Sequence, residues 1–439
     1  MTRLADILCV AGTPRARARL DRLETRGGRT SAAVEARVRR IVADVRRRGD
    51  RALVDWTRRL DGVRRSPAGL RVPQDDLAAA FRDLPRVARR DLLLAARRIR
   101  AFHSRQRERS WTFRDTAGAR IGQRLTPLER VGVYVPGGRA AYPSTVLMTA
   151  IPARVAGVDE IVAVSPSGPG GYAPVILAAC HVAGVDALYR VGGAQAVAAL
   201  AYGTKAIRRV DKIVGPGNVY VATAKRLCYG QVDIDSIAGP SEVLVIADGS
   251  ADPALVAADL LAQAEHDPLA ASVCLTSDRR LAERIVSALG TQLAALPRRA
   301  IAAASLASYG AIVVTRSIAE AIEISNRLAP EHLELAVRAP RRWVSRLRHA
   351  GAIFLGQRTP EAFGDYLAGP NHVLPTGGTA RFASPLGVYD FVKRTSLIEA
   401  GPRTLRRLGP AVMRLAALEG LEAHGRAVAR RLVAQAGGR

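Results

Sequence analysis

The first long stretch of the chain has the apolar spacing of amphipathic helices. Between Ser31 and about Arg109, apolar residues recur three and four positions apart, as in the series Val34, Val38, Ile41, Val42 and Val45. This spacing places them on one face of a helix. The pattern therefore predicts an N-terminal helical segment, residues 1–126, whose apolar faces pack on another part of the protein.

From Leu128 onward the pattern changes to short apolar runs that alternate with helical stretches. Such runs include VGVYV, EIVAVSP, SEVLVIAD and GAIVVT, and several of them end in a glycine turn. Repeated strand, turn and helix units are typical of a parallel sheet covered by helices on both faces. We therefore expect an α/β fold with two Rossmann-like parallel-sheet domains, residues 127–236 and 237–380.

The last part of the chain returns to a helical pattern. The segment AVMRLAALEGLEAHGRAVARRLVAQAGGR is amphipathic, and Met413, Leu415 and Leu418 belong to its apolar stripe. An apolar stripe of this kind needs a surface to cover. We expect residues 381–439 to form a C-terminal helical tail that packs on such a surface.

The composition is that of a globular protein with a strongly basic balance. The 439 residues are 48% hydrophobic and 24% charged, and the formal net charge is +27. Such a charge is typical of nucleic-acid-binding proteins. However, only four of the 66 basic residues are lysines, the arginines are scattered, and aromatic residues, which stack on single-stranded bases, make up only 5%. A GC-rich coding bias explains the charge better, and a nucleic-acid partner stays the less favoured alternative.

The cysteines and the apolar runs indicate a reducing compartment. Cys9, Cys180, Cys228 and Cys274 lie far apart in apolar surroundings and form no Cys-x-x-Cys pair, as expected of reduced core thiols. The sequence has no convincing secretory signal and no apolar run of membrane-spanning length. We therefore expect a cytoplasmic enzyme without a membrane partner.

Three glycine-containing turns follow predicted strands of the first α/β domain: VPGGRAAYP, VGGAQA and VGPGN. Turns at strand ends offer backbone N–H groups to ligands, but none of these is the G-x-G-x-x-G dinucleotide fingerprint. Phosphate cradles and ordinary tight turns are therefore equally open interpretations. Beside the turns, Tyr134, Gln195 and Asn218 are candidates to orient a planar or ribose-bearing ligand, although each could instead close its own loop.

A possible metal site begins in the stretch Ala238–Pro268. This stretch predicts a buried strand and then a helix whose last turns carry Gln263 and His266, three residues apart and therefore on one face. A solvated helix end is the more common explanation of such a cluster. Together with Asp365, a hard oxygen donor, and one more histidine, the two residues would form a four-ligand nitrogen and oxygen site suited to zinc.

A candidate acid–base pair stands in the segment PEHLEL. Glu331 and His332 are adjacent, and a carboxylate beside an imidazole can remove protons from alcohols and water. His372 lies nearby in the sequence in a proline-flanked turn. Taken singly, each of these residues is more often structural than functional.

Eight motifs together resemble the histidinol dehydrogenase family, in order and at family-like spacing. They are RVGVYVPGGRAAYPSTVLMTAIPARVAGV, GGAQAVAALAYGT, VDKIVGPGNVYVATAKR, VDIDSIAGPSEVLVIAD, LLAQAEHDP, APEHLEL, GDYLAGPNHVLPT and EGLEAH. The resemblance covers the chain from Leu128 to His424 and is weaker before it.

The resemblance implies a zinc- and NAD-dependent oxidoreductase that converts L-histidinol through L-histidinal to L-histidine with two NAD. It implies the acid–base pair Glu331 and His332. The implied zinc ligands are Gln263, His266, Asp365 and His424. The implied substrate contacts are Ser241, Gln263, His266, His332, Asp365, Glu419 and His424. The implied NAD-binding residues are Tyr134, Gln195 and Asn218.

The resemblance also implies a homodimer with shared active sites. The C-terminal tail would cross to the partner subunit, so that Glu419 and His424 complete the partner's site. That arrangement would give the amphipathic tail the surface it needs. The nearest alternative is a paralogous zinc- and NAD-dependent dehydrogenase that acts on another small alcohol, such as a sulfonated diol.

Overall fold

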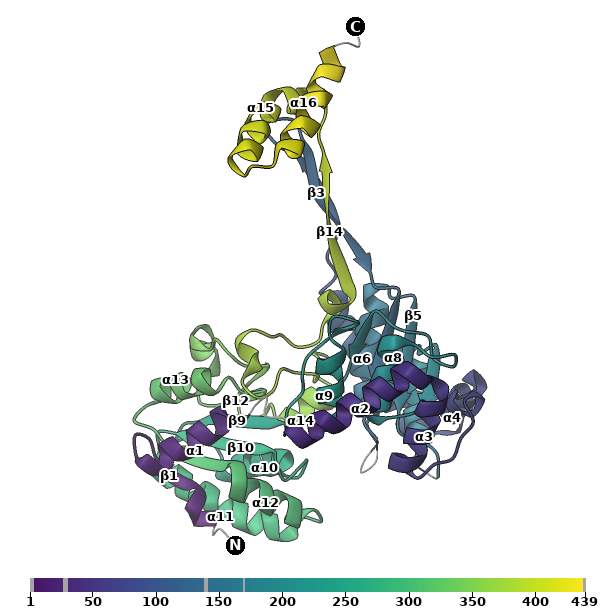
Figure 1. Cartoon of the computed structure of the whole chain (residues 1–439). Coiled ribbons are helices and arrows are strands. Elements are labelled where there is room, and N and C mark those ends of the chain that lie inside the picture. The colour runs from purple at the N-terminus through teal and green to yellow at the C-terminus, as the bar shows by residue number, and fades with distance from the viewer. Residues whose placement is uncertain (1–3, 27–30, 138–140, 169, 437–439) are drawn as a thin grey trace.

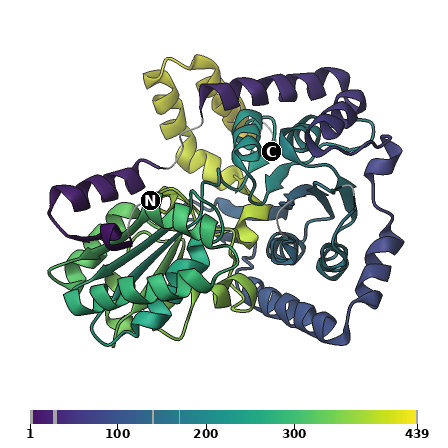
Figure 2. The ribbon, with the colours of Figure 1, turned by 90° about the horizontal axis from the view of Figure 1, so that it is seen from below.

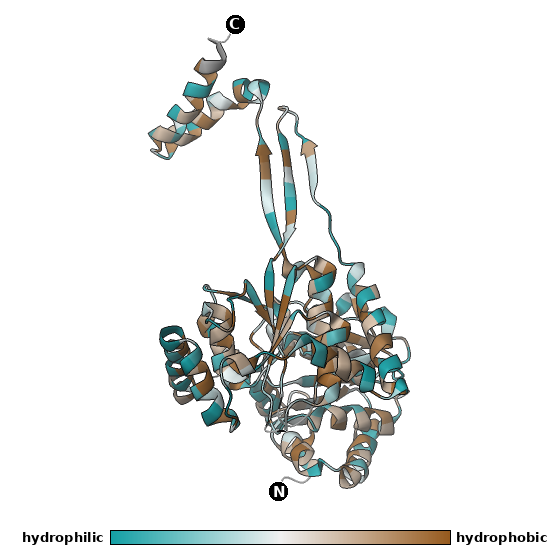
Figure 3. Cartoon of the chain, turned by 90° about the vertical axis from the view of Figure 1, so that its right-hand side faces the viewer, coloured by the Kyte–Doolittle hydropathy of each residue, from teal (hydrophilic) through white to brown (hydrophobic). Residues whose placement is uncertain are grey.

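The computed structural model describes residues 4–26, 31–137, 141–168 and 170–436. Within these residues the chain forms a five-stranded and a six-stranded parallel sheet and a three-stranded antiparallel sheet. The two parallel sheets, with their helices, make up the body of the molecule (Figures 1 and 2). The antiparallel sheet is an arm that leaves this body and carries the C-terminal helices at its tip (Figure 3). The predicted α/β fold with two parallel sheets is confirmed, whereas the exact domain boundaries stay a prediction.

The five-stranded sheet is built from the first predicted α/β domain. In order across the sheet, its strands are β6 (Ala187–Arg190), β5 (Glu160–Ser165), β4 (Arg130–Tyr134), β7 (Lys212–Val214) and β8 (Asp233–Ile234). Alternate residues of β4 face opposite sides, because side chains of a strand alternate. Val131 and Val133 pack towards α6 (Pro143–Ala156) and α7 (Pro174–Ala183). Tyr134 packs towards α8 (Gly193–Tyr202) and α9 (Val219–Cys228).

The predicted N-terminal helices cover this first domain. Helices α2 (Ala32–Arg48) and α3 (Asp50–Asp61) bury their apolar faces on the side of α8 and α9. Helices α4 (Gln74–Asp83) and α5 (Arg86–Ser104) pack on the side of α6 and α7. The surface that the helical segment was expected to cover is therefore the helix layer of the first parallel sheet.

The six-stranded sheet combines the second predicted α/β domain with a strand from the N-terminal segment. In order, its strands are β1 (Leu8–Val10), β11 (Gly310–Val314), β10 (Ala271–Thr276), β9 (Glu242–Ala247), β12 (His332–Ala336) and β13 (Ala352–Leu355). All neighbours are parallel. Strand β1 was not predicted, because three residues are too few to show a period.

Both faces of the six-stranded sheet are also covered. Val243 and Val245 pack towards α10 (Pro253–Ala264), α11 (Arg279–Ala295) and α12 (Arg299–Tyr309). Leu244 and Ile246 pack towards α1 (Pro14–Glu24) and α13 (Ile318–Leu328). Because β9 is central and buried on both faces, its apolar run is continuous rather than alternating.

The arm consists of β14 (Val392–Glu399), β3 (Arg120–Pro127) and β2 (Trp111–Arg114), paired antiparallel. It leads to α15 (Pro402–Leu418) and α16 (Glu422–Ala436), so the predicted helical tail contains strand β14 before its two helices. Other short elements are α14 (Glu361–Tyr366) and the 3-10 helices η1 (Leu4–Ile7), η2 (Ala68–Leu70), η3 (Pro340–Arg346), η4 (Thr379–Arg381) and η5 (Val388–Phe391). No helix in the described part of the chain combines the length and the hydropathy of a membrane span.

Candidate active site

The candidate site lies where the two parallel sheets face each other. His332 and Glu242 stand at the amino ends of β12 and β9, so the second sheet contributes its amino edge. The first sheet contributes its carboxyl edge, where α6 follows β4, since the Asn371 side chain donates to the Met148 carbonyl in the second turn of α6 at 2.6 Å. The strand-to-helix turns identified in the sequence therefore mark only the first sheet's half of the site.

Glu331 and His332 enter the sheet at the start of β12. Both residues are buried, with exposed fractions of 5% and 4%. The Glu331 carboxylate Oε2 accepts a hydrogen bond from the backbone N of Glu242 at 2.9 Å. The His332 Nδ1 donates to the backbone O of Glu242 at 3.0 Å. Both predicted acid–base residues are thus bound to the main chain of one residue.

Of the predicted zinc ligands, Gln263 lies in α10 and the exposed His266 lies just after it. Gln263 is fully buried, and neither atom of its amide has a hydrogen-bond partner among the described residues. His266 follows the end of the helix, where its Nδ1 donates to the Ala262 carbonyl at 2.9 Å. That bond fixes the tautomer and leaves Nε2 with a free lone pair, the usual state of a ligating histidine.

The third predicted ligand, Asp365, lies close to His332 and to Glu361. His332, Glu361 and Asp365 each offer a ligand atom, and these atoms all lie within 4.8 Å of one another. Glu361 was not identified from the sequence. It stands four residues before Asp365 and shares a helix face with it, which was the one signal available.

Burial and like charges shift the titration of these groups. Burial lowers the pKa of His332 to about 4, against the opposing influence of the Asp365 carboxylate, so its imidazole is neutral at neutral pH. Burial, together with the nearby Glu242 and Asp365 charges, raises the pKa of Glu331 well above its ordinary value. Burial and the Asp365 charge likewise raise the pKa of Glu361. Perturbed groups gathered in this way are typical of functional sites.

Two further histidines, His266 and His372, influence the titration of His332. The charges of His266 and His372 both act on the pKa of His332, which places the three rings within electrostatic range of one another. Burial lowers the pKa of His372, and its Nε2 is buried without a hydrogen-bond partner in the part of the chain that the structure describes. The sequence identified His372 only as a polar residue in a turn.

The predicted NAD-binding residues lie on the carboxyl edge of the first sheet. The hydroxyl of Tyr134 accepts a hydrogen bond from the Gly193 N at 3.0 Å, and burial raises its pKa to about 12. Gln195 is fully buried, and both of its amide atoms lack a partner among the described residues. Asn218 caps α9, with its Oδ1 accepting from the backbone N of Tyr220 and Val221 at 3.0 and 3.2 Å. Residues 138–140 of the VPGGRAAYP turn lie outside the described residues.

A buried ion pair shapes the turn before Asn218. The Lys225 ammonium pairs with the Asp235 carboxylate and also donates to the Gly215 carbonyl at 3.0 Å. Asp235 Oδ2 in turn accepts from the Gly215 N at 2.7 Å. Gly215 has a φ of 108° and approaches the Tyr134 carbonyl so closely that a Cβ would clash. The turn is therefore rigidly held next to Tyr134.

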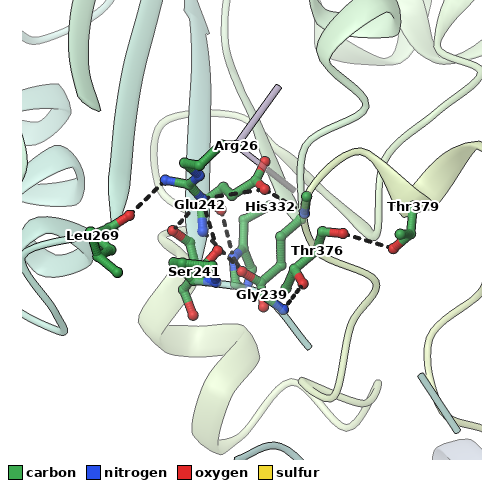
Figure 4. Close-up of polar contacts among 12 residues, drawn as sticks. Arg26, Gly239, Ser241, Glu242, Leu269, His332, Thr376 and Thr379 are labelled. Carbon is green, nitrogen blue, oxygen red and sulfur yellow. Dashed lines mark hydrogen bonds and ion pairs between the residues drawn. The ribbon is translucent and has the colours of Figure 1, made fainter. Parts of the chain in front are cut away.

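Ser241 stands directly before β9, in the turn that leads into the acid–base region (Figure 4). Its carbonyl accepts hydrogen bonds from Ala271 N at 3.0 Å and from the Arg26 guanidinium at 3.2 Å. The same turn is bound to the loop after His372, because the Gly239 N donates to the Thr376 hydroxyl at 2.5 Å. Ser241 is half-buried at the edge of the cluster.

Within a single chain, the predicted site residues of the C-terminal tail lie away from the candidate site. Glu419, which follows the last residue of α15, and His424 in α16 are both exposed, and these helices lie at the tip of the arm, far from the body (Figure 1). Large apolar residues of these helices are also exposed, including Leu415 at 61% and Leu418 at 84%. Within one chain, the predicted fourth zinc ligand and one predicted substrate contact are therefore separated from the others.

Comparisons with known proteins agree with this picture. Residues 24–432 match the family model described as histidinol dehydrogenase. The histidinol dehydrogenase of Syntrophotalea carbinolica is 55% identical over 415 residues, which are 94% of this chain and 96% of that protein. That of Geobacter metallireducens is 55% identical over 408 residues, 93% and 94% of the two chains. The crystal structure of histidinol dehydrogenase from Elizabethkingia anophelis superposes with a TM-score of 0.92 at 35% identity and covers 98% of both chains.

Proposed function

The chain belongs to the histidinol dehydrogenase family, and from this premise we propose that it oxidises L-histidinol through L-histidinal to L-histidine with zinc and two NAD. The fully buried amide of Gln263, which has no hydrogen-bond partner among the described residues, is the observation that carries this proposal. A buried amide without a protein partner is costly unless a ligand or an ion satisfies it.

The donor set fits zinc. Gln263, His266 and Asp365 offer amide, imidazole and carboxylate atoms, and His424 of a partner subunit would complete four ligands of the nitrogen and oxygen kind. Bound zinc would supply Lewis-acid polarisation of a substrate oxygen and a fixed point for the amino alcohol. Gln263 would bind the ion through its side-chain carbonyl oxygen. The hydrogen bond of His266 Nδ1 to Ala262 would leave the Nε2 of His266 available to the ion.

His332 and Glu331 would move the protons. The Nε2 of His332 accepts the hydroxyl proton of the alcohol as the first hydride leaves. Glu331, whose pKa burial raises well above its ordinary value, then accepts a proton from the water that adds to the aldehyde. His332, after it has released the first proton to solvent, takes the hydroxyl proton of this hydrated aldehyde as the second hydride leaves. One imidazole thus serves both oxidations, and the carboxylate serves the hydration between them.

Tyr134, Gln195 and Asn218 would bind NAD at the carboxyl edge of the first sheet. NAD would supply the hydride acceptor in each oxidation. Two features support this position: the buried amide of Gln195, which has no hydrogen-bond partner among the described residues, and the turn held by Lys225.

A homodimer with shared active sites would bring the tail residues into place. Glu419 and His424 would contact the substrate and the metal of the partner subunit, together with its Ser241, so that the exposed apolar stripe of the tail is covered. We also propose a cytoplasmic location, which the four free and buried cysteines support.

The yield of NADH per histidinol tests the proposed reaction. With zinc present and NAD in excess, limiting L-histidinol should give two equivalents of NADH, and L-histidinal should give one. A panel of other small alcohols, including sulfonated diols, serves as the control for substrate identity. A yield of one equivalent, or faster turnover of another alcohol, would contradict the proposal.

A further inference from the structure

Arg26 is a buried arginine that lies against the candidate site although it comes from the N-terminal segment. Its side chain is only 4% exposed and forms an ion pair with the Glu242 carboxylate, with the nitrogen and oxygen 3.3 Å apart. The guanidinium also lies over the Tyr309 ring, 5.2 Å from its centroid. Its remaining partners are the carbonyls of Leu269 at 2.8 Å, Pro240 at 2.8 Å and Ser241 at 3.2 Å.

Glu242 connects this arginine to the acid–base pair (Figure 4). Its carboxylate accepts from the Gly377 N at 2.5 Å in addition to Arg26. Its backbone N and O hold Glu331 and His332, at 2.9 and 3.0 Å. A shift of Glu242 would therefore move both side chains at once, whereas each of them could otherwise shift independently.

The bond from His332 to the Glu242 carbonyl determines which ring nitrogen is basic. A carbonyl only accepts hydrogen bonds, so the imidazole proton resides on Nδ1 and the lone pair on Nε2. That Nε2 is buried and has no hydrogen-bond partner among the described residues. The position of the Glu242 main chain therefore sets both the tautomer and the direction of the basic atom.

We propose that Arg26 and Glu242 are positioning residues that hold Glu331 and His332 in their working geometry through the main chain of Glu242. The proposal rests on the proposed function, in which these two residues transfer protons. An arginine suits the role because its planar guanidinium can bind a carboxylate and several carbonyls at the same time, which the single ammonium of lysine cannot do.

The first test is kinetic and uses the zinc-loaded enzyme. We expect Arg26→Met and Glu242→Gln each to lower kcat for histidinol at least about 10-fold, since small misplacements of reacting groups are costly. The KM for histidinol and the zinc affinity, measured by chelator competition, should stay within about 3-fold, because neither residue is among the proposed zinc ligands or substrate contacts. Arg26→Lys should fail to restore kcat.

The matched control is Arg130→Met. Arg130 is a second buried arginine, 6% exposed and paired with Glu160 at 2.9 Å, but it stands at the amino edge of the first sheet. The Arg130→Met enzyme should be less stable than the wild type but should keep its kcat. If Arg26→Met does not fold, Glu242→Gln, which keeps the size of the side chain, carries the test alone.

Combining Arg26→Met with His332→Asn distinguishes a positioning role of Arg26 from a general effect on stability. In the His332→Asn enzyme there is no imidazole to position, so adding Arg26→Met should lower kcat far less than it does in the wild type. An equal fold-loss in both backgrounds, or an unchanged kcat in the folded single variants, would overturn the proposal. The proposal would also be overturned if the loss of kcat in these variants were explained by loss of zinc.

The tautomer of His332 can be measured by NMR, which tests the positioning role without an activity assay. In protein labelled with ¹⁵N-histidine, the His332 ring, assigned by its loss in His332→Asn, should show the Nδ1–H tautomer. Arg26→Met should mix the two tautomers, whereas Arg130→Met should not. Tautomers that stay unchanged in Arg26→Met and in Glu242→Gln would refute the positioning role even if histidinol proved not to be the substrate.

Discussion

At the scale of single residues, His332 is the side chain whose removal should matter most. Its imidazole is neutral because burial lowers its pKa to about 4, and its Nε2 is without a partner among the described residues. We expect His332→Asn to lower kcat for both histidinol and histidinal by about 10²- to 10⁴-fold, the usual contribution of general acid–base catalysis. NADH formation from each substrate measures this loss. Metal analysis should show unchanged zinc, and a kcat near that of the wild type would exclude the role.

Replacing Glu331 should slow the oxidation of histidinal more than the oxidation of histidinol. Glu331→Gln keeps an oxygen that can accept from the Glu242 N, so the local structure should remain, but the amide cannot take a proton from water. We therefore expect histidinal oxidation to fall at least about 10-fold more than histidinol oxidation. Single-turnover measurements with each substrate provide the comparison. Equal losses on the two substrates would mean that Glu331 has no separate role in hydration.

At the scale of elements, most strands could be predicted from the sequence but the site could be predicted only in part. Strands such as β4 and β9 are continuous apolar runs because both faces of each sheet are covered, and such runs are easily identified. Strand β12 was missed because His332 and Glu334 interrupt its apolar residues on a face that turns to α10. Glu361 and Arg26 were missed because their function depends on neighbours that are distant in sequence.

Strand β12 also carries a carboxyl group that should make stability depend on pH. Burial, with the Asp259 charge opposing ionisation as well, raises the pKa of Glu334 from 4.5 to about 9. Its Oε1 accepts from the Glu361 N at 2.7 Å, so the group lies between β12 and α14. Between these two pKa values the folded chain keeps a proton that the unfolded chain has lost. The free energy of unfolding should therefore fall as the pH rises, by at most about 1.4 kcal/mol per pH unit.

Glu334→Gln isolates this contribution. The amide stays neutral at every pH and can still accept from the Glu361 N, so the fall between about pH 5 and pH 8 should become clearly shallower. Urea unfolding at several pH values provides the measurement. Glu283→Gln is the control, because Glu283 lies in an exposed pair with Arg279 and its side chain is 52% exposed. Parallel pH profiles for the wild type and Glu334→Gln would show that the group is ionised in the folded chain.

At the scale of the whole molecule, the arm separates the tail from the body. Strands β3 and β14 pair over eight positions and place α15 and α16 well away from both parallel sheets (Figure 3). The sequence predicted the amphipathic helices but not the arm, because the polar residues of β14 find their partner strand about 270 positions earlier in the chain. An exposed apolar stripe at the end of an extended arm is what a segment that docks on a second subunit requires.

Mixed dimers test whether the tail works in the partner's site. His424→Ala has an intact body and a defective tail, whereas His332→Asn has a defective body and an intact tail. Each variant alone should be inactive. If the tail acts in the partner subunit, a mixed dimer contains one site built from the intact body and the intact tail. Random reassortment of equal amounts should therefore restore about a quarter of the wild-type activity. If the tail instead folds back on its own body, both sites of every mixed dimer stay defective and no activity returns on mixing.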